Sequence, residues 1–271
     1  MKIYVNKKGL IFIFNLLALI ISFTLIIRYN GNLYTGFYEY INKIKVHSRN
    51  KMYKKFTEVN KLTYSPAVPK NIPNEKIVYL TFDDGPSSHG TPKILDILKK
   101  YDIKATFFVV GKYVEANPDV LRRIHSEGHK IANHSYSHSY NNCTNVEKLT
   151  KEIYKTEEVI KKILGIDHKN TVFRFPGGSN GKNKILKNAV EKNGFQYIDW
   201  NCLGNDSISK KLLSKEEIIN SVKKTSQDLE NVTILLHDSN SKTTTFEAVP
   251  EIIEYFLERK FKFLTIPDKI E

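Results

Sequence analysis

Short runs of β-branched and aromatic residues alternate with amphipathic segments from residue 76 to the end of this 271-residue chain. Such an alternation is typical of a mostly parallel β-sheet with helices packed on its outside. It predicts about seven strands, in a sheet that either closes into a barrel or stays open and doubly wound. In both arrangements functional side chains gather at the C-terminal ends of the strands. The predicted strands are 77–82, 105–110, 130–135, 172–175, 196–200, 232–237 and 261–266.

Polar residues mark where the predicted helices begin. The pairs Thr144 with Glu147 and Ser214 with Glu217 each have the spacing of a capping box, in which two side chains bond free backbone N–H groups. Thr91 directly precedes a proline and is a predicted N-cap of the helix after the first strand. These signals place helices between the strands, as the predicted sheet requires.

Residues 10–27 form an apolar run without a charged residue, close to the roughly 20 residues that cross a bilayer as a helix. Lys2, Lys7 and Lys8 precede the run, and this excess of cations favours an N-terminus that stays in the cytoplasm. We therefore predict a transmembrane helix that holds an extracellular domain at the cell membrane. A cleaved signal peptide and a secreted protein are the alternative, although no small-residue cleavage site follows the run.

Three parts are predicted along the chain: a signal anchor at 1–28, a polar stalk at 29–75 and a globular domain at 76–271. The net charge of +13 is concentrated before the globular domain. Residues 1–76 carry 13 Lys and Arg against 3 Asp and Glu, whereas residues 77–271 carry 29 against 26. No basic helix with interleaved aromatic residues is evident in the globular domain, so we do not expect nucleic-acid binding. The basic stalk suits either contact with anionic lipid or a solvated spacer.

Cys143 and Cys202 are the two cysteines of the chain. They do not form a CxxC pair, which argues against a structural zinc site of the zinc-finger kind. In an oxidising compartment they suit one disulfide, and two free thiols are the alternative.

Ionisable side chains follow the predicted strands at the ends where functional groups gather. Charged groups are costly to bury unless they are paired or bind a metal, so their convergence predicts a functional site at this edge of the sheet. They are Asp83 and Asp84 after the first strand, His134 and His138 after the third, Arg174 after the fourth, Asp206 after the fifth, and His237 with Asp238 after the sixth.

His134 and His138 are four residues apart and can reach one ion from a single turn. A carboxylate from another strand would complete three ligands and leave a fourth position for water, which is the open arrangement of a catalytic zinc site. Water on such an ion loses its proton near neutral pH and becomes a nucleophile. Of the adjacent pair Asp83 and Asp84, one can bind the metal while the other acts as a base, if the chain turns at Gly85-Pro86.

Four sequence blocks make residues 77–266 resemble the polysaccharide deacetylase family, also called NodB-like or carbohydrate esterase family four. In chain order the blocks are TFDDGP (81–86), HSYSH (134–138), RFPGG (174–178) and LLH (235–237). The resemblance implies a distorted (β/α) barrel with fewer than eight repeats, which agrees with the predicted strand count. It also implies that the globular domain is the catalytic domain.

The resemblance assigns roles to the first three blocks, residue by residue. It implies that Asp83 is the general base and that Asp84, His134 and His138 hold a divalent metal ion. That ion is usually zinc, with cobalt as a substitute. Arg174 would orient Asp83 through a charge-assisted contact.

The same resemblance implies the acid and the substrate contacts. His237 would be the general acid, oriented by Asp206. The backbone N–H of Gly177 would stabilise the oxyanion, with Pro176 beside it in the substrate site. Leu235 would line the pocket for the acetyl methyl group.

Two positions depart from the family pattern and bear on contacts with sugar. Many relatives carry an aromatic residue where this chain has Gly177, and many carry a tryptophan where it has Ser207. Trp200 is a candidate to compensate, although a tryptophan on a strand is more often part of a core.

The sequence therefore predicts a metal-dependent enzyme that removes N-acetyl groups from N-acetylglucosamine or N-acetylmuramic acid of peptidoglycan. Chitin-like oligomers, poly-N-acetylglucosamine and O-acetylated xylan are alternative substrates. A catalytically silent carbohydrate-binding module and a membrane-anchored scaffold are the alternatives that are not enzymes. The predicted partners are an acetylated amino-sugar polymer and, through residues 10–27, the membrane.

Overall fold

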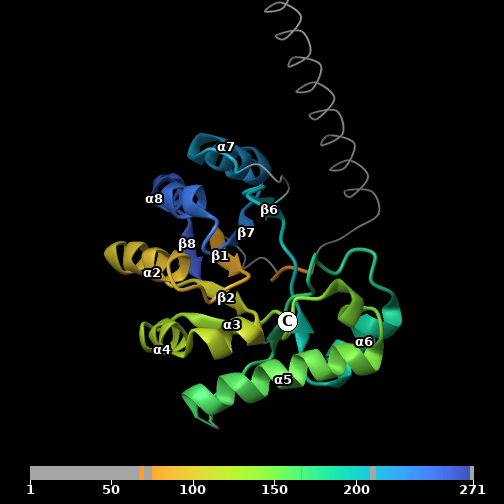
Figure 1. The fold of residues 1–271 in the computed structure, drawn as a ribbon. Coiled ribbons are helices and arrows are strands. Elements are labelled where there is room, and N and C mark those ends of the chain that lie inside the picture. Colours follow the sequence, from red (N-terminus) through yellow and green to blue (C-terminus); the bar gives the residue numbers. More distant parts are fainter. Residues whose placement is uncertain (1–66, 70–74, 166, 208–211, 269–271) are drawn as a thin grey trace, which may run out of the picture. The chain divides into compact units, whose positions relative to one another are not determined.

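Parallel strands form the centre of the domain, and helices surround them (Figure 1). The computed structural model describes residues 67–69, 75–165, 167–207 and 212–268, all within one unit, Pro66–Glu271. The strands are β1 (Ile77–Asp83), β2 (Thr106–Val109), β3 (Lys130–Asn133), β4 (Val172–Phe173), β5 (Gln196–Tyr197), β6 (Cys202–Leu203), β7 (Asn231–His237) and β8 (Lys262–Leu264).

The sheet follows the order β5-β4-β3-β2-β1-β7-β6, and each neighbouring pair in this path is parallel. An eighth strand, β8, pairs with the first half of β1, whereas β2 pairs with its second half. The path is a half-barrel of seven parallel strands, which confirms the predicted distorted (β/α) barrel. The sequence missed β6, which has two residues and closely follows β5.

Helices connect the strands and cover the outside of the sheet (Figure 1). Helix α8 packs against both α2 and α7, while α5 packs against α3, α4 and α6. The helices are α2 (Gly90–Lys100), α3 (Gly111–Ala116), α4 (Pro118–Ser126), the 3₁₀ helix η1 (Tyr140–Cys143), α5 (Val146–Leu164), α6 (Lys184–Lys192), α7 (Lys215–Ser226) and α8 (Thr243–Glu258).

The predicted helix caps are correct in one case and wrong in two. Ser214 forms the predicted capping box at the start of α7. At α5 the N-cap is Asn145 instead of Thr144, because the Thr144 hydroxyl donates to a carbonyl of the preceding 3₁₀ turn. Helix α2 begins one residue before Thr91, whose hydroxyl instead donates to the buried carboxylate of Asp238.

All residues of β1 are buried, as expected for a parallel strand that is covered on both faces. Val78 and Phe82 belong to the large apolar cluster beneath the helices. Ile77 and Tyr79 belong to a smaller apolar cluster on the inner face of the sheet. Because strand side chains alternate between the faces, Asp83 at the end of β1 also points inward.

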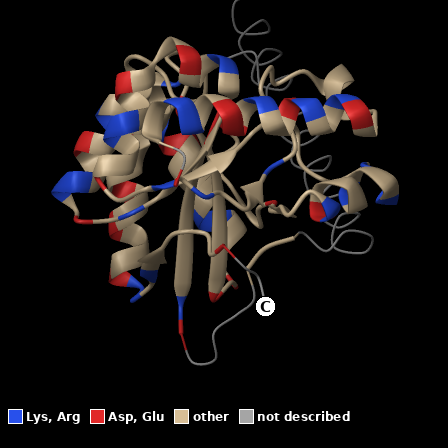
Figure 2. Cartoon of the chain, turned by 90° about the horizontal axis from the view of Figure 1, so that it is seen from below, with Lys and Arg blue, Asp and Glu red and all other residues tan. Residues whose placement is uncertain are grey.

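The predicted membrane segment 10–27 and most of the predicted stalk lie outside the described residues. Within the described ranges, no helix is long and apolar enough to cross a bilayer. Lys and Arg are interspersed with Asp and Glu along the helices of the domain (Figure 2). This mixture matches the nearly balanced charge of residues 77–271.

Cys143 and Cys202 are free thiols in two separate apolar clusters, so they do not form the disulfide that the sequence left open. Burial raises the pKa of Cys143 to about 11 and the pKa of Cys202 to about 12. The thiolate is the reactive form of cysteine, and it is therefore scarce at neutral pH.

We expect neither thiol to react with Ellman's reagent in the folded protein, because both are buried and protonated. Both should react once guanidinium unfolds the chain in the absence of reductant. The measurement is the absorbance of the released thionitrobenzoate before and after unfolding. Rapid labelling of the native protein would contradict the burial, and no labelling after unfolding would show that the thiols are bonded to each other.

Candidate active site

Asp83 and His237 lie side by side at the ends of β1 and β7, because the two residues are register partners in this parallel pair. Arg174 and His134 reach the same space by alternation, since the residues two positions before them pack in the inner cluster. All four side chains are buried. The strand pattern thus brings together four of the residues that the sequence singled out.

Arg174 holds the carboxylate of Asp83 in place. Its Nη1 donates to Asp83 Oδ1 over 2.7 Å and to the hydroxyl of Thr81 over 2.8 Å. Its other N–H groups donate to the backbone carbonyls of Ile198 and Asp199. Burial lowers the pKa of Arg174, and the charge of Asp83 opposes this shift. One oxygen of Asp83 is therefore fixed by Arg174, while Oδ2 lies toward the histidines.

Asp84, His134 and His138 each offer one ligand atom, and these three atoms lie within 4.8 Å of one another. Asp84 Oδ1 lies 3.2 Å from His138 Nε2 and 3.7 Å from His134 Nε2. One carboxylate oxygen and two imidazole nitrogens form a donor set that suits a divalent transition metal such as zinc. Asp83 Oδ2 lies 3.6 Å from His134 Nε2, at the edge of this cluster.

The two ring nitrogens of His134 have different roles. Nδ1 lies 2.8 Å from the carbonyl oxygen of Arg174, which can only accept a hydrogen bond, so Nδ1 carries the proton. Burial lowers the pKa of His134 to about 3, so the ring is neutral and Nε2 offers its lone pair toward Asp84. A hydrogen bond at the far nitrogen is what fixes histidine ligands in metal sites. The residues present therefore fit a divalent ion.

Three residues around the metal-ligand cluster have a left-handed backbone: Asp84 with φ 75°, Ser135 with φ 68° and His138 with φ 53°. Non-glycine residues seldom adopt this conformation, and it persists where the surrounding structure compensates for its energy. Strand alternation alone would direct Asp84 away from Asp83. The turn predicted at Gly85-Pro86 therefore begins one residue earlier, at Asp84 itself.

Side chains that the sequence analysis missed hold the loop between His134 and His138. The Oδ1 atom of Asn133 accepts from the N–H of Ser135 over 2.9 Å. The carboxylate of Glu152 accepts from the N–H of Ser137 over 2.6 Å and from its hydroxyl over 2.9 Å. The signal in the sequence was a glutamate on the buried stripe of α5.

His237 is held by Asp206, as the resemblance implied for these two residues. Asp206 Oδ1 lies 2.8 Å from His237 Nδ1, and Asp206 Oδ2 accepts from the His237 N–H and from the Thr245 hydroxyl. Burial lowers the pKa of His237, but the charge and hydrogen bond of Asp206, with the charges of Asp83 and Asp84, raise it to about 9. His237 is therefore protonated at neutral pH and can donate a proton.

A tight turn places Gly177 beside the cluster. Gly177 and Gly178 both have positive φ, of 73° and 82°, and the Gly178 N–H closes the turn onto Phe175. The N–H of Gly177, next to Pro176, donates to no acceptor among the described residues, so it is free to bind an oxyanion. Leu235 lies two residues before His237 on the same side of β7, with 7% of its surface exposed.

Asp199 secures this turn and was also missed by the sequence analysis. Its carboxylate accepts from the Ser179 N–H over 2.8 Å and from the Ser179 hydroxyl over 2.6 Å. Burial raises the pKa of Asp199 to about 6. The adjacent Trp200 is partly exposed and packs against Gly178.

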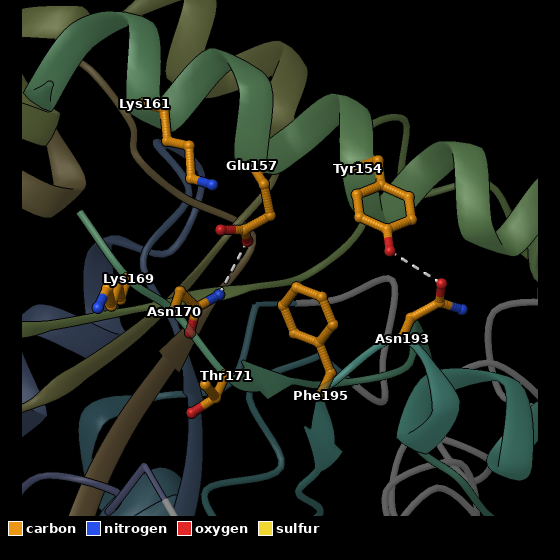
Figure 3. Close-up of a pocket in the computed structure, with 8 residues that line it drawn as sticks. All are labelled: Tyr154, Glu157, Lys161, Lys169, Asn170, Thr171, Asn193 and Phe195. Carbon is orange, nitrogen blue, oxygen red and sulfur yellow. Dashed lines mark hydrogen bonds between the residues drawn. The ribbon is translucent and has the colours of Figure 1, made fainter. Parts of the chain in front are cut away.

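A separate hollow of about 280 Å³ lies between α5 and the segments around β4 and β5 (Figure 3). The buried carboxylate of Glu157 binds Asn170 there and also binds Asn133, which supports the metal-ligand loop. None of the residues predicted for the active site lines this hollow. The hollow is therefore distinct from the candidate active site.

The family model described as polysaccharide deacetylase matches residues 70–198. A peptidoglycan-N-acetylglucosamine deacetylase of Bacillus cereus is 34% identical over 218 residues, which are 80% of this chain and 75% of that protein. The chain belongs to the polysaccharide deacetylase family. The family match includes Asp83, Asp84, His134, His138 and Arg174 and ends before Asp206 and His237.

Solved structures of this polysaccharide deacetylase family share the fold. A carbohydrate esterase family four enzyme of Streptococcus mutans superposes with a TM-score of 0.67 at 30% identity, covering 72% of this chain and 87% of that one. The peptidoglycan-N-acetylmuramic acid deacetylase PdaC of Bacillus subtilis is 34% identical over 84% of this chain but 45% of its own length. The deacetylase family is generally metal-dependent.

The contact between Asp206 and His237 predicts how activity depends on pH. A general acid must be protonated, so activity falls as pH rises through the pKa of His237. Asp206→Asn removes the charge that raises this pKa most, so the alkaline limb of the kcat/KM profile should move to lower pH. Thr245→Val is the matched control, because it removes a hydrogen bond to Asp206 and keeps the charge. If the alkaline limb of Asp206→Asn lies at the same pH as in the parent, His237 is not the group whose deprotonation causes it.

Proposed function

We propose that this deacetylase hydrolyses the N-acetyl groups of peptidoglycan amino sugars with a zinc ion held by Asp84, His134 and His138. The observation that carries the proposal is the placement of a fixed carboxylate, Asp83, at the edge of a three-ligand metal cluster with a protonated histidine, His237, beside it. Relatives named for peptidoglycan-N-acetylglucosamine and peptidoglycan-N-acetylmuramic acid deacetylation support this substrate class.

A divalent ion bound at the cluster would supply a Lewis acid that polarises the acetamide carbonyl and acidifies water. Asp83 takes the proton from the attacking water, as its Oδ2 faces the cluster while Arg174 holds Oδ1. The water oxygen bonds to the carbonyl carbon, and the N–H of Gly177 stabilises the negative charge that develops on the carbonyl oxygen.

His237 completes the reaction as the general acid. It donates its Nε2 proton to the sugar nitrogen while the carbon–nitrogen bond breaks, since its Nδ1 is held by Asp206. The products are acetate and a free amino sugar. Leu235, on the same side of β7, supplies an apolar surface for the acetyl methyl group.

We further propose that residues 10–27 anchor the protein in the cell membrane, with the catalytic domain outside the cell. The uncharged apolar run and the lysines that precede it support this orientation. A tether of this kind would keep the domain close to a cell-wall substrate.

Acetate release from purified peptidoglycan tests the proposed reaction. We expect release by the zinc-loaded full-length protein, and we expect Asp83→Asn to lower kcat roughly a hundred- to ten-thousand-fold by removing the base. Asp119→Asn, an exposed site in the first turn of α4, is the matched control and should retain full activity. Parallel assays use chitin oligomers and acetylated xylan. Release from only one of these would identify that polymer as the substrate in place of peptidoglycan. Release from none of the three polymers would favour a carbohydrate-binding role.

Removal of the metal tests the ligand assignment. Dialysis against a chelator should abolish acetate release, and added zinc or cobalt should restore it. Elemental analysis should find about one ion per chain in the parent protein and far less in His134→Ala. His125→Ala, an exposed histidine on α4, is the control for the loss of an imidazole and should keep the ion. Full activity of the metal-free protein would rule out the proposed metal centre.

A further inference from the structure

Tyr140 is an exposed aromatic residue beside the metal-ligand cluster. It is the first residue of η1, and 58% of its surface is exposed. Its ring lies edge-on to the ring of His138, with 5.8 Å between the centroids. Tyr140 has no part in the proposed reaction, and a tyrosine that served only to fill the core would be covered.

The same ring lies over the turn that carries the candidate oxyanion N–H. A Cβ atom built on Gly177 would lie 2.7 Å from Tyr140 Cε1, closer than real side-chain contacts allow. A Cβ atom on Gly178 would lie 2.9 Å from Cη2 of Trp200. The two glycines therefore leave space for two aromatic rings that come from other segments of the chain.

The segment that carries Tyr140 is anchored by the residues that directly follow the exposed ring. Cys143, at the other end of η1, is fully buried among apolar residues. The side-chain amide of Asn142 donates to Glu152 and to the hydroxyl of Ser137, within the loop that ends at His138. An exposed ring on an anchored segment is prepared for a ligand, because little conformational freedom is lost on binding.

We infer that Tyr140 forms the aromatic wall of the sugar site, packing against the apolar face of a sugar ring in the acetylated polymer. The inference rests on the proposed function and adds a specificity-determining residue to it. The ring lies between the ligand His138 and the turn at Gly177, so a sugar whose acetyl group enters the site passes next to it. Gly177 has no side chain, and the ring of Tyr140 occupies the space beside it from a different loop.

Steady-state kinetics on peptidoglycan test this role. Loss of packing that is equal in ground state and transition state raises KM and leaves kcat unchanged, so we expect Tyr140→Ala to raise KM about fivefold. Tyr140→Phe should behave as the parent, because the ring and not the hydroxyl makes the contact. Tyr154→Ala is the matched control, since Tyr154 is 51% exposed and lines the separate hollow (Figure 3). The zinc content of all variants should equal that of the parent.

Binding separates a failure of this inference from a failure of the proposed reaction. Co-sedimentation with peptidoglycan is measured for the zinc-loaded Asp83→Asn variant and for the double variant that also carries Tyr140→Ala. We expect Tyr140→Ala to weaken binding about fivefold, the factor predicted for KM. If the parent releases acetate but Tyr140→Ala leaves KM unaltered, the aromatic wall is refuted and the proposed reaction stands. The same holds if Tyr140→Phe raises KM as much as Tyr140→Ala does. If the parent releases no acetate, weakened binding in Tyr140→Ala would keep the wall, and unaltered or undetectable binding would refute it.

A double-mutant cycle tests the contact itself. Gly177→Ala strains the backbone at positive φ in any background, but it collides with the ring only where Tyr140 is present. We expect Gly177→Ala to lower the Tm more in the parent than in the Tyr140→Ala background. Equal decreases would show that the ring does not lie on Gly177.

Discussion

The guanidinium of Arg174 is fully buried and donates to Thr81, Asp83 and the carbonyls of Ile198 and Asp199. Removing one partner of a buried ion pair leaves an uncompensated charge, so the pair is costly to break even though it adds little stability by itself. The contacts join the end of β1 to the segments that follow β4 and β5. The position of the candidate base therefore depends on the assembly of β1, β4 and β5 around one side chain.

Period-two alternation explains why much of the site could be predicted from the sequence. Asp83, His134, Arg174 and His237 each continue the inner face of a strand, and strand ends are where a parallel sheet gathers its functional groups. Asp84 breaks this alternation through a left-handed backbone, which no hydrophobic pattern encodes. Its place in the cluster followed from the family resemblance and not from the period of the strand.

The residues that hold the loops of the site could not be predicted from the sequence, for a different reason. Asn133, Glu152 and Asp199 act on backbone groups of loops that are close in space, and the choice of partner depends on the assembled fold. The short strand β6 was also missed. The N-cap of α5 was predicted at Thr144 instead of Asn145, because the sequence does not show that the Thr144 hydroxyl bonds a carbonyl of the preceding turn. Strand alternation itself failed at Asp84, where a strained backbone serves the site, as expected for a functional segment.

Arg174 contacts both halves of the site with chemically different groups. Its side chain holds Asp83, but its backbone carbonyl holds the Nδ1 proton of His134. A substitution at this position changes the first contact and keeps the second, since every residue has a carbonyl. A descendant of this protein with a substitution at Arg174 would therefore lose the orientation of Asp83 and keep that of His134. In such a protein, retained metal binding would not be evidence of retained catalysis.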